Sequence, residues 1–193
     1  MSEIYADVRR TPGASLEIAW QDWRAARNDL LKNHPQSPLD FDQRSVFRGL
    51  PYYAYDLDWR VTGIFEDEGI GGSHEIELGA DDRIRLTRVG IVRFSLKQIE
   101  ASLSAFWIEG YGGGLFIPFR DSTNGVSTFG GGRYLYDTIK GADLGTNGAE
   151  LNLDFNFSYN PSCAYNSRWV CPLAPAENTL ALAVTTGEKY LAF

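Results

Sequence analysis

From residue 15 to residue 50 the apolar positions recur with the period of an α-helix. The stripe of the first helix consists of Leu16, Trp20, Trp23, Leu30 and Leu31. Ser15 can cap this helix, and it should end near His34, because Pro35 disfavours helical geometry in the residue before it. Asp40 then opens a second, short helix, with Gln43 at the capping-box position. Residues 1–14 are expected to form a loose arm, so the pattern predicts two N-terminal helices.

Beyond residue 51 the pattern changes to the alternation of β-strands. Short apolar or alternating runs, separated by turns rich in Gly, Asp and Asn, follow one another to the C-terminus. The predicted strands are Trp59–Phe65, His74–Leu78, Ile84–Val89, Ile91–Leu96, Leu103–Ile108, Leu115–Phe119, Arg133–Tyr136, Leu151–Phe157 and Thr179–Thr185. The series predicts a mainly β fold, an antiparallel β-sandwich or barrel-like domain with the two helices packed on it. Residues 1–50 and 51–193 are expected to form one folding unit.

The composition limits the classes of partner. A net charge of −7 disfavours nucleic acid, because phosphate binding needs concentrated Lys and Arg. No apolar run approaches the roughly 20 residues that span a bilayer, and the N-terminus lacks the apolar stretch of a signal peptide. We therefore expect a soluble, cytoplasmic protein with no membrane partner. The exposed edges of a small sheet would permit a homodimer.

The two cysteines and two histidines are poor candidates for zinc ligands. Their spacing matches none of the usual ligand patterns, so no metal site is expected. A bridge between Cys163 and Cys171 would be worth about 3 kcal/mol in an oxidising compartment, although cytosolic thiols are normally reduced. Alternatively one of the two thiols is a nucleophile whose pKa is lowered by Arg168, or both thiols are buried and inert. His74 lies in a Gly/Ser turn, where we expect a solvated imidazole.

Polar and aromatic loops gather between residues 111 and 178. Ordering irregular backbone costs about 1–2 kcal/mol per residue, so such loops usually serve a function. Arg120 offers a planar fork for a carboxylate or phosphate, or else it pairs with a nearby acid while Asp121 caps the turn. Gly130–Gly132 could point backbone N–H groups at an anion, or form a tightly packed, bulged turn. A packed turn is the simpler interpretation of Gly112–Gly114.

Further polar residues follow towards the C-terminus. Asp154 and Asn156 are expected on one face of a strand, where their oxygens could contact a ligand or a hard cation. The full spacing of a calcium loop is missing, and such residues also build turns. Glu177 and Lys189 could hold an acidic ligand or move a proton at one rim of the fold, or they are ordinary surface charges.

The longest motifs of the chain fall in these loops and in the N-terminal helices. They are Trp23–Arg27, His34–Leu39, Phe47–Tyr53, Gly114–Gly125, Gly130–Leu135, Leu153–Asn156, Tyr159–Tyr165, Cys171–Leu173 and Gly187–Lys189. With these motifs the chain resembles the DUF1684 family, a domain of unknown function. Phe157 and Ser158 replace a usual Arg-Ala pair, which weakens any scheme that needs three arginines. The resemblance implies no established reaction, but it implies that the loops belong together.

We therefore expect the segments 120–134, 154–163 and 177–189 to build one pocket for a small anionic or polar metabolite. Its expected ligand-binding residues are Arg120, Asp121, Gly130, Gly131, Gly132, Arg133, Tyr134, Asn156, Tyr159, Asn160 and Asn178. A rival hypothesis is an enzyme, with catalytic candidates Asp154, Glu177, Cys163 and Lys189, acting as a hydrolase or through thiol chemistry. A third is a structural or interaction protein whose loops lock the fold. The sequence identifies no cofactor and leaves open whether the protein is an enzyme.

Overall fold

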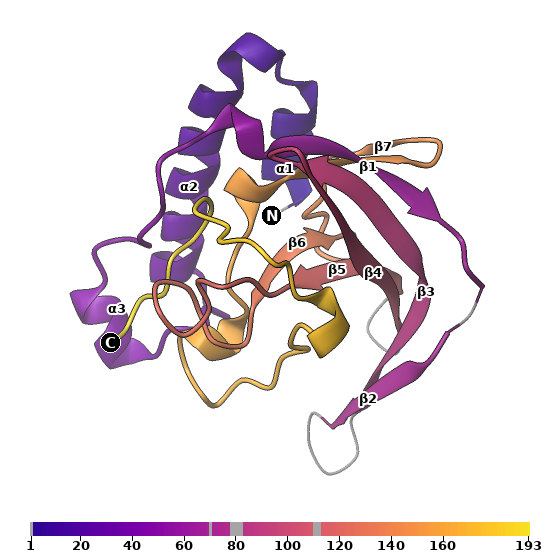
Figure 1. The fold of residues 1–193 in the computed structure, drawn as a ribbon. Coiled ribbons are helices and arrows are strands. Elements are labelled where there is room, and N and C mark those ends of the chain that lie inside the picture. The colour runs from indigo at the N-terminus through magenta and orange to yellow at the C-terminus, as the bar shows by residue number, and fades with distance from the viewer. Residues whose placement is uncertain (1, 70, 78–82, 110–112) are drawn as a thin grey trace.

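The structure of the chain, a computed structural model, describes residues 2–69, 71–77, 83–109 and 113–193, without the side chains of His74, Ile76, Glu77 and Arg83. The predicted solvation of His74 and part of the Gly112–Gly114 triplet lie outside the described residues. Within them, a curled antiparallel sheet lies opposite the N-terminal helices. The C-terminal segment crosses the concave side of the sheet (Figure 1).

The sheet has the form of a half-barrel. Seven described strands pair in the order β6-β5-β4-β3-β1-β8-β7, and β2 pairs with β3 beside this path. The strands are β1 Arg60–Glu66, β2 Ser73–Glu77, β3 Arg83–Leu96, β4 Ile99–Glu109, β5 Gly114–Phe119, β6 Arg133–Asp137, β7 Thr146–Asn147 and β8 Glu150–Asp154. Every pairing between them is antiparallel, so the predicted barrel-like, mainly β class is confirmed.

The long strand β3 replaces two predicted strands. The prediction of separate strands on either side of Gly90 is wrong, because β3 continues through a register shift between Arg88 and Gly90. A Cβ at Gly90 would lie 2.4 Å from the carbonyl oxygen of Glu66, so this position needs glycine. The bulge bends the strand and increases its twist, which helps the sheet to curl.

The N-terminal region forms three helices: α1 Ser2–Arg10, α2 Leu16–Asn33 and α3 Phe41–Val46. The predicted loose arm is wrong, since α1 buries Tyr5 and Val8 against the rest of the molecule. Helix α2 ends at Asn33 with His34 as its C-cap, which confirms the predicted end near His34, but the Ser15 side chain makes no capping hydrogen bond. The capping box of Asp40 and Gln43 is confirmed, with both of its hydrogen bonds present.

Two other predicted strands are wrong in part. Residues 155–157 form a 3₁₀ turn after β8, so Asp154 and Asn156 do not share a strand face. Instead the Asp154 carboxylate accepts the backbone N–H of Asn156, which closes the turn. Residues 179–185 form extended loop, whose bridge to the sheet joins Thr179 to Arg120. The short hairpin strand β7 is an element that the pattern did not indicate.

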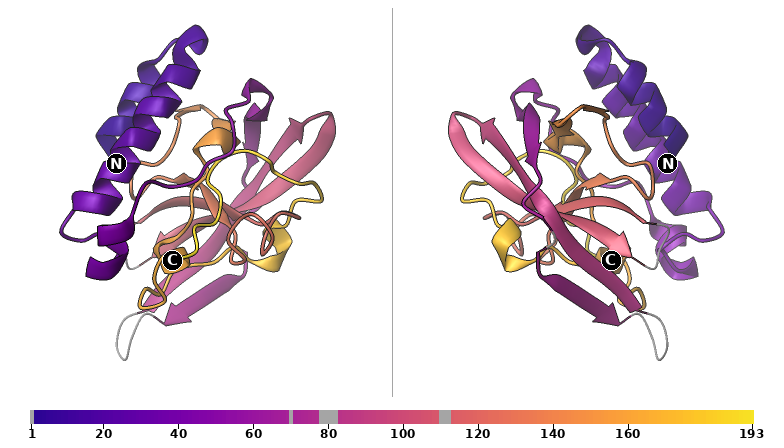
Figure 2. Two further views of the ribbon diagram at one scale, coloured as in Figure 1. Left: turned by 90° about the vertical axis from the view of Figure 1, so that its left-hand side faces the viewer. Right: turned by 90° about the vertical axis from the view of Figure 1, so that its right-hand side faces the viewer.

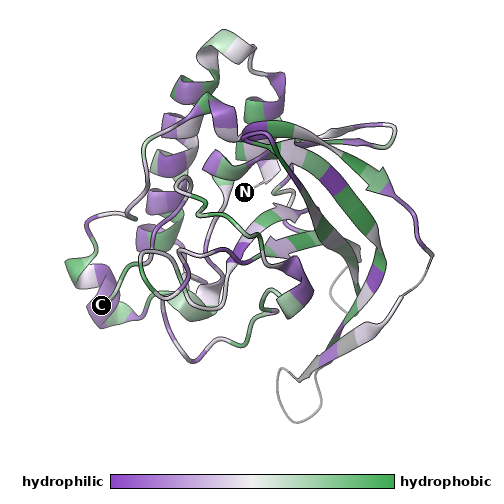
Figure 3. Ribbon diagram, in the orientation of Figure 1, coloured by the Kyte–Doolittle hydropathy of each residue, from purple (hydrophilic) through white to green (hydrophobic). Residues whose placement is uncertain are grey.

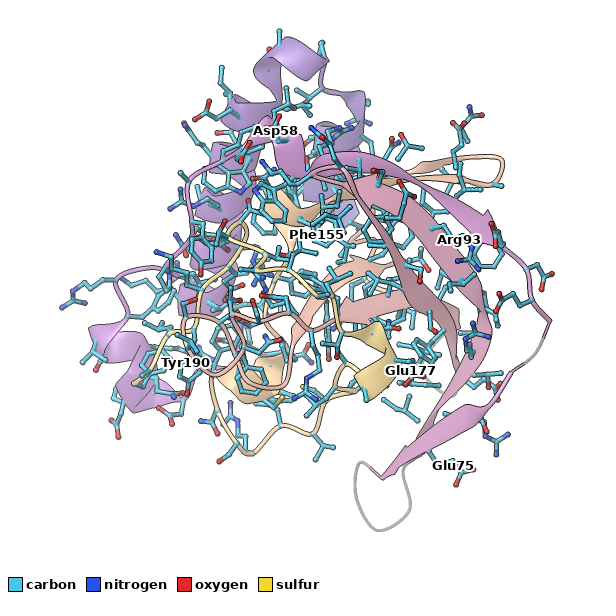
Figure 4. All side chains as sticks on the ribbon, in the orientation of Figure 1. Asp58, Glu75, Arg93, Phe155, Glu177 and Tyr190 are labelled. Carbon is cyan, nitrogen blue, oxygen red and sulfur yellow. The ribbon has the colours of Figure 1, made fainter. Side chains whose placement is uncertain are left out.

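Two large buried clusters fill the space between the layers, and a smaller third one lies between α2, α3 and Tyr165. One joins the concave face of the sheet to the C-terminal segment, and Phe155 lies at its centre (Figure 4). The other joins Tyr5, Trp20 and Trp23 of the helices to strands β3 to β6. The helices therefore share a core with the sheet. Figure 2 shows them lying along one side of the molecule in both views. Hydrophobic residues recur along the strands, whereas α2 shows hydrophilic residues between its apolar ones (Figure 3). No helix in the described part of the chain is long and apolar enough to cross a bilayer.

Candidate functional site

Arg133 lies in the interior at the start of β6. Its side chain is wholly buried, and its Nη2 atom lies 2.9 Å from Oδ2 of the equally buried Asp121. The other guanidinium hydrogen bonds go to backbone carbonyls of residues 184, 186 and 188. Asp121 also accepts the backbone N–H groups of Thr123 and Val184. This ion pair thus fastens the C-terminal segment to the end of β5 and the start of β6.

A second buried ion pair joins helix α2 to the same segment. Arg27 Nη2 lies 2.7 Å from Oε2 of Glu188, and both side chains are almost fully buried. Glu188 also accepts hydrogen bonds from the Tyr165 hydroxyl and from the backbone and side-chain N–H groups of Asn160. The Oδ1 atom of Asn160 is buried and has no hydrogen-bond partner among the described residues.

Arg120 and the second glycine triplet form one bulged loop. Arg120 donates a 2.7 Å hydrogen bond to the carbonyl of Gly130, and none of the described carboxylates pairs with it. Gly132 has a φ of +90°, and a Cβ there would lie 2.5 Å from the carbonyl oxygen of Phe119. Gly131 packs against Phe129 and Leu173. The loop is therefore tightly packed at Gly131 and Gly132, and open only at Gly130.

Three polar motif residues bond the protein's own backbone. The buried Asn178 side chain contacts the backbone of Ser104 on β4 and the carbonyl of Pro118 on β5. The side-chain oxygen of Asn156 accepts the backbone N–H of Asp56, and its side-chain N–H group donates to the carbonyl of the same residue. Asp154 is buried beside Arg60, at 3.3 Å, and burial raises its pKa against the effect of its hydrogen bonds to Asn156.

The remaining catalytic candidates lie apart from these networks. Glu177 is an exposed residue of the short 3₁₀ helix Ala176–Asn178, inside the curl of the sheet (Figure 4). Lys189 lies near the C-terminus, with its Nζ atom 4.5 Å from the ring centre of Tyr53. The structure does not bring Asp154, Glu177, Cys163 and Lys189 into one cavity among those that the described residues form.

A cavity of about 360 Å³ opens between the sheet and the loop that contains both cysteines. We call it the mouth cavity. Its apolar wall consists of Ile84, Ile108, Phe116, Ile139, Trp169 and Val170. Its polar lining consists of Tyr134, Asp137, Lys140, Ser162, Arg168 and Cys171. Half of these apolar side chains come from β3, β4 and β5 and half from loops, and the charged ones come from the end of β6, the turn after it and the segment around residue 168. The cavity therefore has an apolar body and a charged rim.

The charges at the rim are unequally exposed. The Asp137 carboxylate is buried and lies 3.4 Å from Lys140 Nζ, and its Oδ2 atom also accepts the Tyr159 hydroxyl at 3.2 Å. Arg168 is exposed and donates one hydrogen bond, to the carbonyl of Ser37. None of the carboxylates in the described ranges pairs with Arg168. The Arg168 guanidinium is thus a cation at the rim of the cavity whose other N–H groups can donate to a ligand.

The two thiols meet at the wall of the mouth cavity. The Cys171 sulfur accepts the backbone N–H of Cys163 at 3.3 Å, and the two thiol side chains lie beside one another. The thiol hydrogen bond from Cys163 lowers the pKa of Cys171, helped by that backbone N–H and by the charge of Lys140, against burial. The same hydrogen bond, together with burial, raises the pKa of Cys163. Of the two thiols, Cys171 is therefore the one whose pKa is lowered.

A second cavity of about 370 Å³ adjoins the first one and shares Lys140 and Ser162 with it. Tyr159 and Asn160 line this helix-side cavity, together with residues of α2. The segments expected to build one pocket are thus divided. Tyr134, Tyr159 and Asn160 reach the two cavities, whereas the other expected ligand-binding residues lie in the networks and turns described above.

Sequence reasoning did not single out Asp137, Lys140 or Trp169 as site residues. The stretch from Asp137 to Gly141 has the composition of an ordinary turn after a strand, and only the curl of the sheet makes it part of a cavity. Trp169 is held by a hydrogen bond from its indole to the carbonyl of Pro38. The sequence did contain a signal for a site here, because ordering the adjacent side chains of Arg168 and Trp169 in a loop costs conformational entropy. Within the described ranges no group of three or more His, Cys, Asp and Glu side chains is arranged to hold a metal ion.

Comparison with known proteins agrees with this architecture. The sequence pattern of the family described as "Protein of unknown function (DUF1684)" matches residues 45–189. The chain belongs to the DUF1684 family. This DUF1684 chain is also similar to the solution structure of an uncharacterised protein from locus rrnAC0354 of Haloarcula marismortui. That protein is 34% identical, with a TM-score of 0.65, and the match covers 91% of this chain and 95% of the other. In a comparison of the present chain with curated proteins, none of them matches.

Proposed function

We propose that this DUF1684 protein binds a small amphipathic acid in the mouth cavity. The observation that carries the proposal is an apolar-walled cavity of about 360 Å³ with an exposed Arg168 at its rim that no described carboxylate neutralises. Small-molecule sites are typically concave and mostly apolar, with a few polar groups that fix the orientation of the ligand. The volume lies at the lower end of the range for such sites, so the ligand is small.

Each part of the lining has a role in this proposal. The guanidinium of Arg168 offers a planar fork of donors that matches a carboxylate or phosphate. Lys140 adds positive charge nearby, although Asp137 partly neutralises it. Tyr134 and Trp169 supply aromatic walls for the apolar body of the ligand. Arg120 and Arg133, which were expected to hold the anion, act in this proposal through the fold of the neighbouring loops.

A fluorescent probe tests the proposal. We would titrate the protein with anilinonaphthalene sulfonate, an apolar aromatic acid, and in parallel with the neutral phenylnaphthylamine. Arg168→Ala should weaken sulfonate binding about tenfold, because a hydrogen bond to a charged group is worth about 1.5–3 kcal/mol. Lys140→Ala should weaken it less. Binding of the neutral dye should be unchanged in both variants.

The matched control is Lys32→Ala, which removes an exposed lysine of α2 that lines neither of the two cavities. It changes the net charge as much as the Lys140 variant does, so it should leave both dyes unaffected. Equal affinity of the wild type and the Arg168 variant for the sulfonate would contradict the proposal.

A further inference from the structure

The cysteine pair forms a donor and acceptor arrangement beside a cavity. Cys171 lines the mouth cavity, its sulfur accepts the backbone N–H of Cys163 at 3.3 Å, and the Cys163 thiol lies beside it. Lys140 adds positive charge on the same side. A thiolate stabilised by donors and a cation is the nucleophilic form of cysteine. A second thiol in hydrogen-bond contact is placed to attack whatever disulfide the first one forms.

We propose that Cys171 is a nucleophile for small disulfides that enter the mouth cavity, and that Cys163 is the resolving thiol. The favoured substrates carry an acidic group that Arg168 can bind. This preference for acidic disulfides, but not the thiol chemistry, rests on the function proposed above.

The exchange balances without any other reactant. The Cys171 thiolate attacks one sulfur of the disulfide, forms a Cys171 mixed disulfide and releases the other half as a thiolate. Cys163 then loses its proton to solvent and attacks the Cys171 sulfur, which forms the Cys163–Cys171 bond and releases the second half, which takes up a proton from solvent. The protein gives up two electrons and is oxidised, and the small disulfide is reduced to two small thiols.

The surrounding contacts hold both cysteines in place for these two steps. The Tyr134 hydroxyl donates a 2.8 Å hydrogen bond to the carbonyl of Pro172, next to Cys171. Between the cysteines, the side-chain amide of Asn166 donates to Asp40 and Gln43 at the start of α3. The loop is therefore anchored at the cavity wall and at its middle, so the resolving step needs no large movement of the chain.

The test uses the reduced full chain with dithiobis-nitrobenzoate, an aromatic acidic disulfide, and with the neutral dithiodipyridine. At pH 7 the wild type should react roughly three times faster than an unstructured peptide thiol. It should release two equivalents of the coloured thiol and finish two hydrogens lighter, with no adduct. Cys163→Ser keeps a donor to Cys171 but cannot resolve, so it should release one equivalent and retain the adduct on Cys171.

Two further variants sharpen the test. Cys163→Ala also removes the hydrogen bond to Cys171 and should react more slowly than Cys163→Ser, with the largest difference below pH 7. In Cys171→Ser, the remaining Cys163 should react no faster than the peptide. An adduct retained by the wild type, a first adduct on Cys163, or a rate equal to that of the peptide would overturn the proposal.

The same reagents separate this inference from the proposed function. Arg168→Ala should slow the acidic reagent and leave the neutral one unchanged. If both reagents are unaffected by that variant while the order of reaction is as stated, acid binding fails and the thiol chemistry stands. If Cys171→Ser still binds the sulfonate dye but the wild type shows no fast exchange, the thiol chemistry fails and acid binding stands.

Discussion

At the scale of single residues, the structure separates arginines that hold the fold from arginines that can meet a ligand. Arg133 is wholly buried and paired with Asp121, whereas Arg120 is partly exposed and donates to one carbonyl. Arg133→Ala leaves the Asp121 carboxylate buried without its cation, so it should lower the free energy of unfolding by about 3–5 kcal/mol. Urea denaturation followed by tryptophan fluorescence measures the loss.

Arg120→Ala is the matched control, since it removes a guanidinium only thirteen positions away in the same loop region. Losing one hydrogen bond to the carbonyl of Gly130 should cost about 1 kcal/mol. Arg133→Lys keeps the charge but not the fork of donors, and its stability should fall between those of the two alanine variants. Equal urea midpoints for the Arg120 and Arg133 alanine variants would refute this division of roles.

At the scale of elements, the loop between β5 and β6 depends on one glycine. Gly132 combines a φ of +90° with a carbonyl oxygen 2.5 Å from the position of a Cβ, so Gly132→Ala requires the backbone of β5 or β6 to move. We expect a loss of stability of at least about 1–2 kcal/mol, seen as a lower melting temperature. Gly130→Ala is the control, because a Cβ at that position has no neighbour within 4 Å. A melting temperature that falls equally in both variants would contradict the steric argument.

The elements also show what the sequence could predict. Periods of 3.6 and 2 identified α2 and most strands, and the capping residues located α3 correctly, because these signals are local. Helix α1 was missed although Ile4, Tyr5 and Val8 have helical spacing, because the pattern covers only nine residues. The partners that hold it, Phe157 and Trp23, are distant in the sequence. The mouth cavity was missed for the same reason: Ile84 and Cys171 meet only because the sheet curls. Tyr134, Tyr159 and Asn160 were expected at a site, and they lie at the two cavities, whose function stays a proposal.

At the scale of the whole molecule, α1 closes the core that joins the helices to the sheet. Tyr5 and Val8 are buried in that core, and the Tyr5 ring meets Trp23 and Phe157. Burying one such side chain is worth about 1.5–3 kcal/mol, so deleting residues 2–10 should cost roughly 3–6 kcal/mol and expose apolar surface. The deletion variant should unfold at a much lower urea concentration than the full chain.

The matched control keeps the chain length and removes polar groups from the same helix. Arg10→Ala breaks only an exposed pair with Asp7, which is worth less than about 1 kcal/mol. Tyr5→Ala should reproduce most of the effect of the deletion, because Tyr5 is the larger of the two side chains that α1 buries. If α1 could be deleted with no more effect than the Arg10 change, the helix would be an appendage and the shared core would be complete without it. If Tyr5→Ala is as costly as expected, the N-terminal helices and the half-barrel unfold together, in one transition seen equally by tryptophan fluorescence and by the far-ultraviolet signal of the strands.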